Sequence, residues 1–386
     1  MRILFLSQYF PPEMGAPAAR VFELSREWAA LGHDVTVLTG FPNHPNGVIP
    51  PEYRGSWVRK ELVAGVKVVR APVYATPNSG KVRRSASYIS YAASATLLGP
   101  MLVSRPDVVI ATSPQLLTGV AGWVLSLLQR VPFVFEVRDI WPQSIVAVGA
   151  LPQNHPAIWA LERLELQLYA RAKRIVVVTD SFVDELSARG VPREKLKVIK
   201  NGVDLELFKP SARENAVRSE LGLRPSDFMC LYVGTHGMAH GLSTMIEAAD
   251  RVRERQDIRF VFVGEGADKP ALKKLAAEKQ LRNVTFVDKQ SRERIPEFLA
   301  ASDLNLVLLR DTPLFRTVLP SKIFEIMGSG RPIALGVDGE ARELLAAAGA
   351  GVFVPPEDAG RLAEEIVRLA GQRGDLVRMG MSGRAF

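Results

Sequence analysis

Short apolar runs alternate with amphipathic stretches along almost the whole chain, and this alternation limits the possible folds more than any other feature. In the first half the runs end in Gly- or Pro-containing loops, and a stretch such as 18–33 places Val21, Leu24 and Trp28 on one helical face. A strand, a helix and a second strand in this order form a βαβ unit with parallel strands. Near-continuous Val and Ile runs are typical of parallel strands covered on both faces. The strands expected here are 2–7, 34–40, 65–72, 107–114, 132–139 and 174–181.

The same alternation begins again after the short polar link 203–210. Expected strands are 228–234, 258–266, 283–289, 304–309 and 332–336, and expected helices are 243–254, 269–280, 294–302 and 322–330. A chain of 386 residues suffices for two domains at about 100–200 residues each. We therefore predict an α/β protein of two Rossmann-like domains, residues 1–205 and 206–386, whose parallel sheets face each other across a cleft. Ligands of such sheets bind beyond the carboxyl ends of the strands, so the loops there are the candidate sites.

Positive charge is concentrated in the first domain. Residues 1–205 contain 23 Lys and Arg against 16 Asp and Glu, and the stretch 54–84 contains eight Lys and Arg but only one acidic residue, Glu61. A basic region attracts an anionic partner such as a phospholipid surface or a lipid diphosphate, although it can also be a solvated face. We expect no nucleic-acid partner, because no aromatic–basic interleaving or zinc-finger spacing is present.

Cysteine content and hydropathy restrict the environment. Cys230 is the only cysteine, which rules out an intramolecular disulfide and predicts a reducing compartment. The apolar run at the N-terminus is too short for a signal peptide. The two longest apolar stretches, 88–103 and 116–128, fall short of the roughly 18 residues of a membrane span. No His-Glu-x-x-His, Cys-cluster or Asp-x-Asp-x-Asp motif occurs, so we expect no protein-bound metal or cofactor.

A glycine-rich turn, GTHGMAHG, follows the expected strand 228–234. Its glycines allow backbone N–H groups to approach a phosphate, and the helix that follows adds a favourable dipole. His236 and His240 are candidate donors to phosphate oxygens. The alternative is a tight strand-to-helix turn without a ligand.

The segment LPSKIFEIMGSGRP, residues 319–332, carries the strongest signal. Ser321 and Lys322 lie in the first turn of the expected helix, where the dipole disfavours a cation unless an anion is bound nearby. Glu325 follows one turn later on the same face, where its carboxylate could accept hydrogen bonds from two vicinal ribose hydroxyls. The alternative is that Lys322 and Glu325 form a surface ion pair, which contributes little.

Three loops of the first domain also follow expected strands. Gly15 in PPEMGAP allows close backbone approach to a ligand, and His44 in FPNHPNG is either catalytic or merely exposed. In FEVRDIWPQS, Arg138 and Asp139 end a strand beside Glu136, and charge at such a position is either functional or part of a local ion pair. We take Arg138, Asp139 and His44 as catalytic candidates.

Taken together, these segments resemble the pattern of glycosyltransferase family 4, which has the GT-B fold. The matches are residues 174–210 with the NGVD sequence, residues 262–309, and PSKIFEIMGSGRPI at 320–333. The resemblance covers nearly the whole chain. The loops 10–20, 39–47, 138–144 and 234–242 resemble a subgroup that builds bacterial surface polysaccharides, including L-fucosamine and colanic-acid transferases.

The resemblance implies a role for individual residues. Glu325 matches the second Glu of the family's Glu-x7-Glu motif and would bind the ribose. The first Glu falls at Thr317, so Thr317 and Leu319 would face the donor sugar. The family's two diphosphate-binding cations fall at about Thr235 and His240, and its catalytic His-Asp pair falls at Arg138 and Asp139. The expected diphosphate-binding residues are Gly15, Gly237, His240, Ser321, Lys322 and Arg316, and the base would contact Lys289 and Ile295.

The resemblance also implies an activity. The chain would retain anomeric configuration without a bound metal while it moves a sugar, expected to be an N-acetylated amino sugar, from a UDP-sugar donor. The acceptor would be a polyprenyl-diphosphate-linked glycan in surface polysaccharide or O-antigen synthesis. We expect a cytoplasmic enzyme, peripheral on the inner face of the plasma membrane, where the basic 54–84 region and the helix 88–103 touch an anionic surface. Family members usually carry a further helix that crosses back onto the first domain, whereas this sequence stops at MGMSGRAF, as either a truncated or a naturally short form would.

Two other functions remain open at this point. UDP-N-acetylglucosamine 2-epimerases share the fold and bind similar donors, and would act on the UDP-sugar without an acceptor. A nucleotide-sugar-binding subunit without catalytic activity is also compatible with Arg138 in place of the family histidine.

Overall fold

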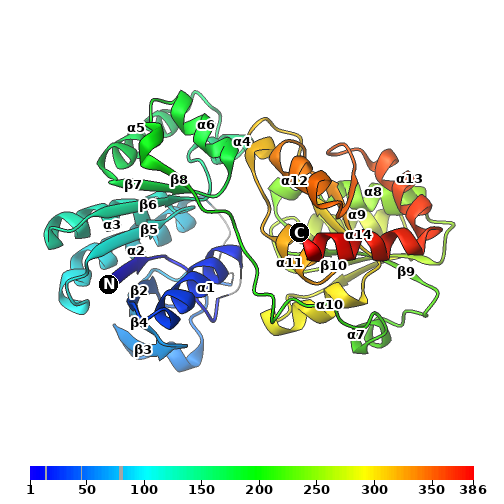
Figure 1. Cartoon of the computed structure of the whole chain (residues 1–386), viewed down its shortest axis with the longest axis horizontal. Helices are drawn as coiled ribbons and strands as arrows, with labels where there is room; N and C mark the ends of the chain where they lie inside the picture. The colour runs from blue at the N-terminus through cyan, green and yellow to red at the C-terminus, as the bar shows by residue number, and fades with distance from the viewer. Residues whose placement is uncertain (14, 45, 78–80) are drawn as a thin grey trace. The chain divides into compact units, whose positions relative to one another are not determined.

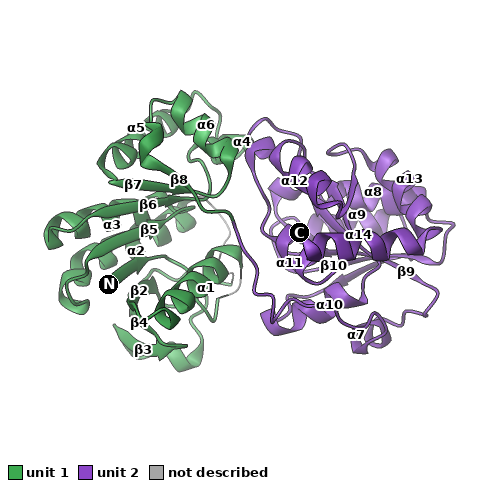
Figure 2. Ribbon diagram, in the orientation of Figure 1, with its two compact units in different colours: residues 1–200 green, residues 201–386 purple. Residues whose placement is uncertain are grey.

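The computed structural model describes residues 1–13, 15–44, 46–77 and 81–386. The chain divides into two compact units, Met1–Lys200 and Asn201–Phe386, which Figure 2 distinguishes by colour. The division lies at 200/201, where the sequence predicted 205/206. In each unit a sheet lies between layers of helices, as Figure 1 shows.

Unit 1 is built, in its described part, on an eight-stranded sheet of order β3-β4-β2-β1-β5-β6-β7-β8. All neighbouring strands are parallel except β3, which pairs antiparallel with β4 at the edge. The strands are β1 Arg2–Leu6, β2 Asp34–Gly40, β3 Arg59–Val63, β4 Val66–Ala71, β5 Val108–Thr112, β6 Phe133–Val137, β7 Arg174–Val177 and β8 Leu196–Val198. The helices are α1 Ala16–Ala30, α2 Lys81–Leu102, α3 Leu116–Gln129, α4 Gln143–Ala147, α5 Pro156–Arg171 and α6 Asp180–Ala188.

Unit 2 contains, over its described residues, a six-stranded parallel sheet of order β11-β10-β9-β12-β13-β14. The strands are β9 Phe228–Val233, β10 Ile258–Val263, β11 Val284–Val287, β12 Leu304–Leu308, β13 Ile333–Gly336 and β14 Gly351–Phe353. The helices are α7 Ala216–Glu220, α8 Ser243–Arg251, α9 Lys269–Glu278, α10 Ile295–Ala301, α11 Lys322–Gly328, α12 Glu340–Ala348, α13 Ala359–Ala370 and α14 Arg373–Ala385.

Both parallel sheets have the strand order of a Rossmann fold. In unit 1 the order runs outward from β1 in two directions, to β2 on one side and to β5 on the other, and in unit 2 β9 lies between β10 and β12 in the same way. Strands before β5, and before β12 in unit 2, are therefore added toward one edge of the sheet, and those from β5 or β12 onward are added toward the other edge. Ligands of open α/β sheets bind at such switch points, beyond the carboxyl ends of the strands. The loops after β9 and β12 are accordingly the first place to look for a site in unit 2.

The central strand of unit 2, β9, is an unbroken apolar run that lies in the core. Every residue from Phe228 to Tyr232 is buried, and the aromatic rings on β9 and β10 pack against the buried faces of α8 and α13. Cys230 is fully buried in this cluster, and burial raises the pKa of its thiol. None of the helices within the described ranges is long and apolar enough to cross a bilayer.

The last helix, α14, packs within unit 2 against α11. The guanidinium of Arg384 donates hydrogen bonds to the carbonyl oxygens of Phe208 and Gly328, at 2.9 Å and 2.8 Å. The end of α11 and the beginning of the unit are therefore held by the same side chain.

Candidate active site

The loop after β9, residues 234–241, rests directly on the loop after β10. The amide of His236 donates to the carbonyl of Glu265 at 2.9 Å. A Cβ atom on Gly264 would lie 2.0 Å from the carbonyl oxygen of Gly234, and one on Gly266 would lie 2.2 Å from that of His236. The glycines of both loops are thus required for this close backbone packing.

His236 is buried in the core of unit 2. Its residue is fully buried, and its ring contacts Tyr232, Phe262 and Phe286 at centroid distances of 5.8 to 6.4 Å. Burial, followed by the charge of Lys269, lowers the pKa of His236 to about 4. Neither ring nitrogen of His236 has a hydrogen-bond partner among the described residues, and its role as a donor to phosphate remains a prediction.

His240 ends the 3₁₀ turn Met238–His240, next to Gly237, which begins it. Its ring centroid lies 6.1 Å from that of Tyr232. Burial, followed by the charge of Lys322, lowers the pKa of His240 to about 3, so the imidazole is neutral at pH 7. It can offer a single N–H to an anion but adds no positive charge.

Lys322 brings a positive charge to this turn from α11. Its Nζ lies 3.9 Å from the Tyr232 ring centroid, and a Cβ atom on Gly234 would come within 2.8 Å of it. Within the described residues, this buried Nζ has no hydrogen-bond acceptor. Burial lowers the pKa of Lys322 to about 7. A buried ammonium with no acceptor is costly, and a bound anion would relieve that cost.

The loop from β12 to α11 brings Lys322 to the switch point. Ser321 precedes the helix and makes no side-chain capping bond, which leaves its hydroxyl available to a ligand. Arg316, the other predicted cation of this loop, has a half-exposed side chain and forms an ion pair with Asp311 at 3.2 Å. Lys322 and Arg316 therefore differ sharply in environment, and Lys322 is the one that borders the glycine-rich turn.

Thr317 and Leu319 stabilise the loop in which they lie. The Thr317 hydroxyl donates to the carbonyl of Leu314 at 2.7 Å and closes the 3₁₀ turn Leu314–Thr317. Leu319 is buried, with 3% of its surface exposed. Both residues shape the approach to α11, while the donor-sugar role expected of them remains a prediction.

Glu325 lies one helical turn after Lys322 and accepts a hydrogen bond from Arg292 Nη1 at 3.3 Å. Arg292 also stacks on Phe208, with 5.3 Å between the guanidinium and the ring centroid. Its partnership with Glu325 was not foreseen, because nothing in the local sequence relates the loop after β11 to α11. The two residues expected at the base, Lys289 and Ile295, lie in that same loop and at the start of α10.

In unit 1, Arg138 and Asp139 follow β6 and are fixed by the end of β5. The hydroxyl of Ser113 accepts from their amides at 2.7 Å and 3.2 Å. Burial raises the pKa of Asp139 to about 6 against the opposing charge of Arg138. Burial also lowers the pKa of Arg138, whose Nε and Nη1 have no partner among the described residues.

Glu136, which the sequence grouped with Arg138 and Asp139, has other partners. Its carboxylate accepts from Arg20 Nε at 3.0 Å and from the Thr112 hydroxyl at 2.6 Å. Arg20 also donates to the carbonyl oxygens of Ile199 and Lys200. The role of Arg20 could not be predicted from the sequence, because this arginine lies on the buried side of α1 within an otherwise ordinary amphipathic pattern.

His44 and Gly15 belong to the loops after β2 and β1. Gly15 has φ of +134° and precedes α1, a conformation that favours glycine. Glu13 Oε1 accepts from the amides of Asn43 and His44, both at 2.9 Å, and the His44 ring lies 5.2 Å from that of Tyr9. Burial raises the pKa of Glu13 to about 7. Glu13 thus organises the loop that carries His44, a role with no signal in the sequence.

Two family models match the chain in succession. A glycosyl transferase 4-like domain matches residues 15–202, and a glycosyl transferases group 1 domain matches residues 214–386. Within the described residues no group of three or more His, Cys, Asp or Glu is placed to hold a metal ion.

Several known proteins are similar over most of their length. The putative colanic acid biosynthesis glycosyl transferase WcaI of Escherichia coli is 27% identical over 340 residues, which are 86% of this chain and 82% of the relative. The D-inositol 3-phosphate glycosyltransferase of Streptomyces bingchenggensis is 26% identical and aligns with 100% of this chain and 84% of the relative. The crystal structure of Anabaena HepE in complex with UDP-glucose has a TM-score of 0.75 at 18% identity and covers 100% of this chain and 94% of its own. The two successive family matches and the two Rossmann-type sheets show that the chain belongs to the family 4 glycosyltransferases of the GT-B fold.

Proposed function

We propose that this glycosyltransferase is a retaining enzyme that transfers a sugar, most simply an N-acetylated amino sugar, from UDP to a lipid-linked glycan during surface polysaccharide synthesis. The observation that carries the proposal is the ammonium of Lys322, buried without an acceptor in the described structure, at the switch point of unit 2. An anionic diphosphate is the ligand that this ammonium and the adjoining glycine-rich turn best accommodate.

Similar proteins support the choice of donor and pathway. HepE has been crystallised with UDP-glucose, and WcaI is named for colanic acid biosynthesis. In the proposed arrangement Gly237, His240, Ser321 and Lys322 hold the diphosphate, with Gly15 and Arg316 as further contacts. Glu325 accepts hydrogen bonds from the ribose hydroxyls while Arg292 fixes its carboxylate. Lys289 and Ile295 contact the base, and Thr317 and Leu319 lie toward the sugar.

The proposed reaction needs stabilisation of the leaving group above all. The bond between the anomeric carbon and the diphosphate oxygen breaks, and the negative charge that develops on the diphosphate meets the Lys322 ammonium and backbone N–H groups. The acceptor hydroxyl attacks the same face of the sugar, and its proton passes to the departing phosphate oxygen. Retention follows from this same-face attack. Arg138, Asp139 and His44 in unit 1 are proposed to orient the acceptor.

A ligand screen and a transfer assay test this function together. UDP and UDP-sugars should raise the melting temperature more than GDP or ADP, because a ligand that binds only the folded state stabilises it by mass action. The variants Lys322→Met and Glu325→Gln should lose this stabilisation. The matched control Lys274→Met, which removes an exposed lysine paired with Glu278, should keep it.

Product analysis distinguishes the alternatives. With a radiolabelled UDP-N-acetylhexosamine and a polyprenyl-diphosphate-linked glycan, we expect a product whose new linkage has the anomeric configuration of the donor by NMR. An inverted product would refute the retaining mechanism. Turnover of the UDP-sugar without acceptor would instead identify an epimerase, and binding without any turnover would identify a non-catalytic subunit.

The proposed location is the inner face of the plasma membrane. On α2, Ile89, Leu97 and Met101 follow one face at helical spacing and are 57%, 71% and 74% exposed, while Arg83 and Arg84 are exposed near its beginning. Apolar side chains beside cations suit an anionic lipid surface. Sedimentation with vesicles containing phosphatidylglycerol should exceed that with phosphatidylcholine alone and should fall for Leu97→Glu. Equal sedimentation with both vesicles would refute the membrane contact.

A further inference from the structure

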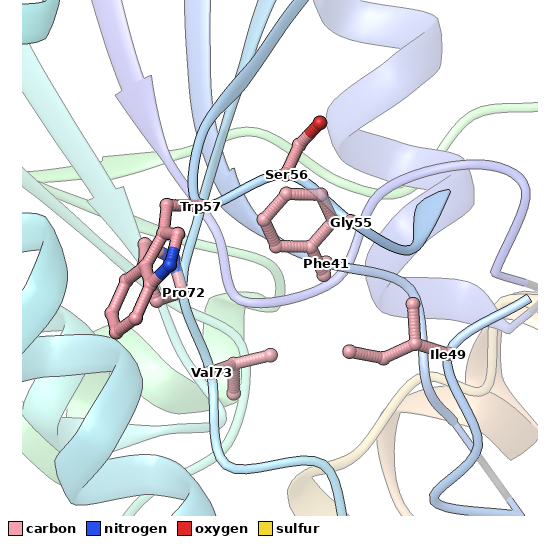
Figure 3. Close-up of a pocket in the computed structure, with 7 residues that line it drawn as sticks. All are labelled: Phe41, Ile49, Gly55, Ser56, Trp57, Pro72 and Val73. Carbon is pink, nitrogen blue, oxygen red and sulfur yellow. The ribbon is translucent and has the colours of Figure 1, made fainter. Parts of the chain in front are cut away.

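Unit 1 contains an apolar pocket that none of the site residues described above lines. It has a volume of about 300 Å³ and is lined by Phe41, Ile49, Gly55, Ser56, Trp57, Pro72 and Val73. In Figure 3 the side chains of Ile49 and Val73 point toward one another across the hollow, and the Phe41 ring lies between the segments that carry them. Its volume lies at the lower end of the range for small-molecule sites.

The pocket lies at the edge of the sheet where ligands of α/β proteins bind. Phe41 directly follows β2, and Pro72 directly follows β4, so both are at the carboxyl ends of parallel strands. The Ser94 hydroxyl of α2 donates to the carbonyl of Pro72 at 2.5 Å, and the Ser90 hydroxyl accepts from the amide of Tyr74 at 2.8 Å. The wall formed by residues 72–74 is therefore fixed to a long helix.

The lining indicates what the pocket can bind. Among the described residues that line it, the Ser56 hydroxyl is the only polar side-chain group apart from the indole N–H of Trp57, and none carries a charge. A sugar ring would need several hydrogen-bond partners, whereas a branched hydrocarbon chain needs none. Trp57 is 84% exposed, an unusual state for the largest apolar side chain, and it is the element that an apolar ligand would cover.

Cations adjoin this apolar lining. The Nε of Arg54 donates to the carbonyl of Ile49 at 2.8 Å, so its guanidinium is tied to a residue of the pocket wall. Arg59, two residues after Trp57, stacks on Tyr53 with 4.6 Å between its guanidinium and the ring centroid, and its Nε lies 3.4 Å from the Glu61 carboxylate. An apolar pocket with cations at its rim matches a ligand that has an apolar tail and a multiply charged anionic head.

We propose that this pocket binds an isoprenyl segment of a lipid diphosphate, with Arg54 and Arg59 facing its diphosphate group. The inference rests on the proposed lipid-linked acceptor and names the part of unit 1 that would recognise its lipid. A polyprenyl chain supplies methyl-branched five-carbon units, whose bulk suits a pocket walled by Ile49, Val73 and Phe41 better than an unbranched acyl chain does. The diphosphate supplies the negative charge that the rim attracts.

Binding of farnesyl diphosphate to the full chain tests the pocket without any sugar transfer. Calorimetric titration should give an affinity at least tenfold higher for farnesyl diphosphate than for inorganic diphosphate or for farnesol. Tryptophan emission should shift to the blue as Trp57 is covered, and Trp57→Phe should remove most of that shift. Val73→Asp should weaken binding at least tenfold, and Arg54→Gln about threefold to tenfold. Val48→Asp is the matched control, since Val48 is 58% exposed and does not line the pocket.

Three results would overturn the proposal. Inorganic diphosphate binding as tightly as farnesyl diphosphate would show that the rim binds anions without help from the pocket. An unchanged affinity in Val73→Asp would place the ligand elsewhere. Equal affinity for dodecyl phosphate would indicate a site for bilayer acyl chains rather than for an isoprenyl chain. UDP stabilisation of the same samples separates the two proposals: if it persists while farnesyl diphosphate fails, only the pocket proposal is refuted, and if UDP alone fails, the donor site is refuted.

Discussion

Replacing Lys322 with methionine should stabilise the protein without ligand and abolish its response to UDP. Burial lowers the pKa of Lys322 from 10.5 to about 7, and at 1.36 kcal/mol per pKa unit the charged form costs about 5 kcal/mol in the folded state. Because the folded pKa lies below the unfolded one, this lysine costs no stability above pH 10.5. The cost grows as the pH falls and is complete below pH 7.

The expected difference between the variant and the wild type follows from these two pKa values. Lys322→Met should be more stable by about 4 kcal/mol at pH 7 but by only about 2 kcal/mol at pH 9. The histidines of the turn do not disturb this comparison, because His236 and His240 have pKa values of about 4 and about 3 and stay neutral throughout. The pKa of Tyr232 is raised by burial, so it does not titrate in this range either.

Differential scanning calorimetry at pH 7, 8 and 9 measures the effect. A change of about 2 kcal/mol corresponds to a shift of roughly 4–8 °C in the melting temperature of a unit of this size. Lys269→Met is the informative control. Lys269 is also buried but donates to Gly264, Glu265 and Asp288 at 2.6–2.9 Å, and these partners raise its pKa against the effect of burial. Its removal should destabilise the protein by about 2 kcal/mol.

Titration with UDP completes the test. Binding of UDP near pH 8 should be accompanied by proton uptake, because the diphosphate favours the charged ammonium, and titrations in buffers of different ionisation enthalpy report the protons taken up. The reasoning would be refuted if the melting curves of the wild type and Lys322→Met shifted in parallel with pH. It would equally fail if Lys322→Met responded to UDP as the wild type does.

Three further expectations concern other parts of the molecule. The pKa of Glu13 is raised from 4.5 to about 7, so the stability it contributes is full below pH 4.5 and is lost as the pH rises through 7. Urea unfolding at pH 5 and pH 8 should show a loss of about 2.5 kcal/mol in the wild type that Glu13→Gln lacks. Gly264→Ala should cost about 2 kcal/mol or more by calorimetry and weaken UDP binding, because its Cβ would lie 2.0 Å from the Gly234 oxygen at a φ of +141°. Arg292→Gln should raise the KM for the UDP-sugar about tenfold with kcat within twofold, since Glu325 loses the partner that orients it, and an unchanged KM would contradict that role.

Most of the sheet could be predicted from the sequence because its strands are continuous apolar runs. Of the edge strands, β11 was expected at 283–289, but β3, β8 and β14 were not. β3 reads Arg-Lys-Glu-Leu-Val and is partly exposed, so charge interrupts the apolar signal, and β8 and β14 are only three residues long. Such segments become strands because a neighbouring strand offers hydrogen-bond partners, which no local pattern reports.

The residues of the candidate site could likewise be predicted only in part. Lys322 could be identified because a lysine in the first turn of a helix conflicts with the helix dipole, and a conflict of this kind is visible in sequence. Its burial against the Tyr232 ring could not, since β9 and α11 are about 90 residues apart in the chain. Glu13, Arg20 and Arg292 were missed for the same reason: each acquires its role from partners on a different loop or strand.

The hydrogen bonds of Arg20 and Arg384 to backbone carbonyl groups limit the length of the segment that is free between the units. Arg20 holds the carbonyl of Lys200 within unit 1, and Arg384 holds that of Phe208 within unit 2. Residues 201–208 separate these two carbonyl groups, so even a fully extended segment could span no more than ~29 Å. The bond from the Phe208 amide to the Asp204 carbonyl shortens it further. Loss of either arginine's hydrogen bonds would lengthen the segment that is free between these two points.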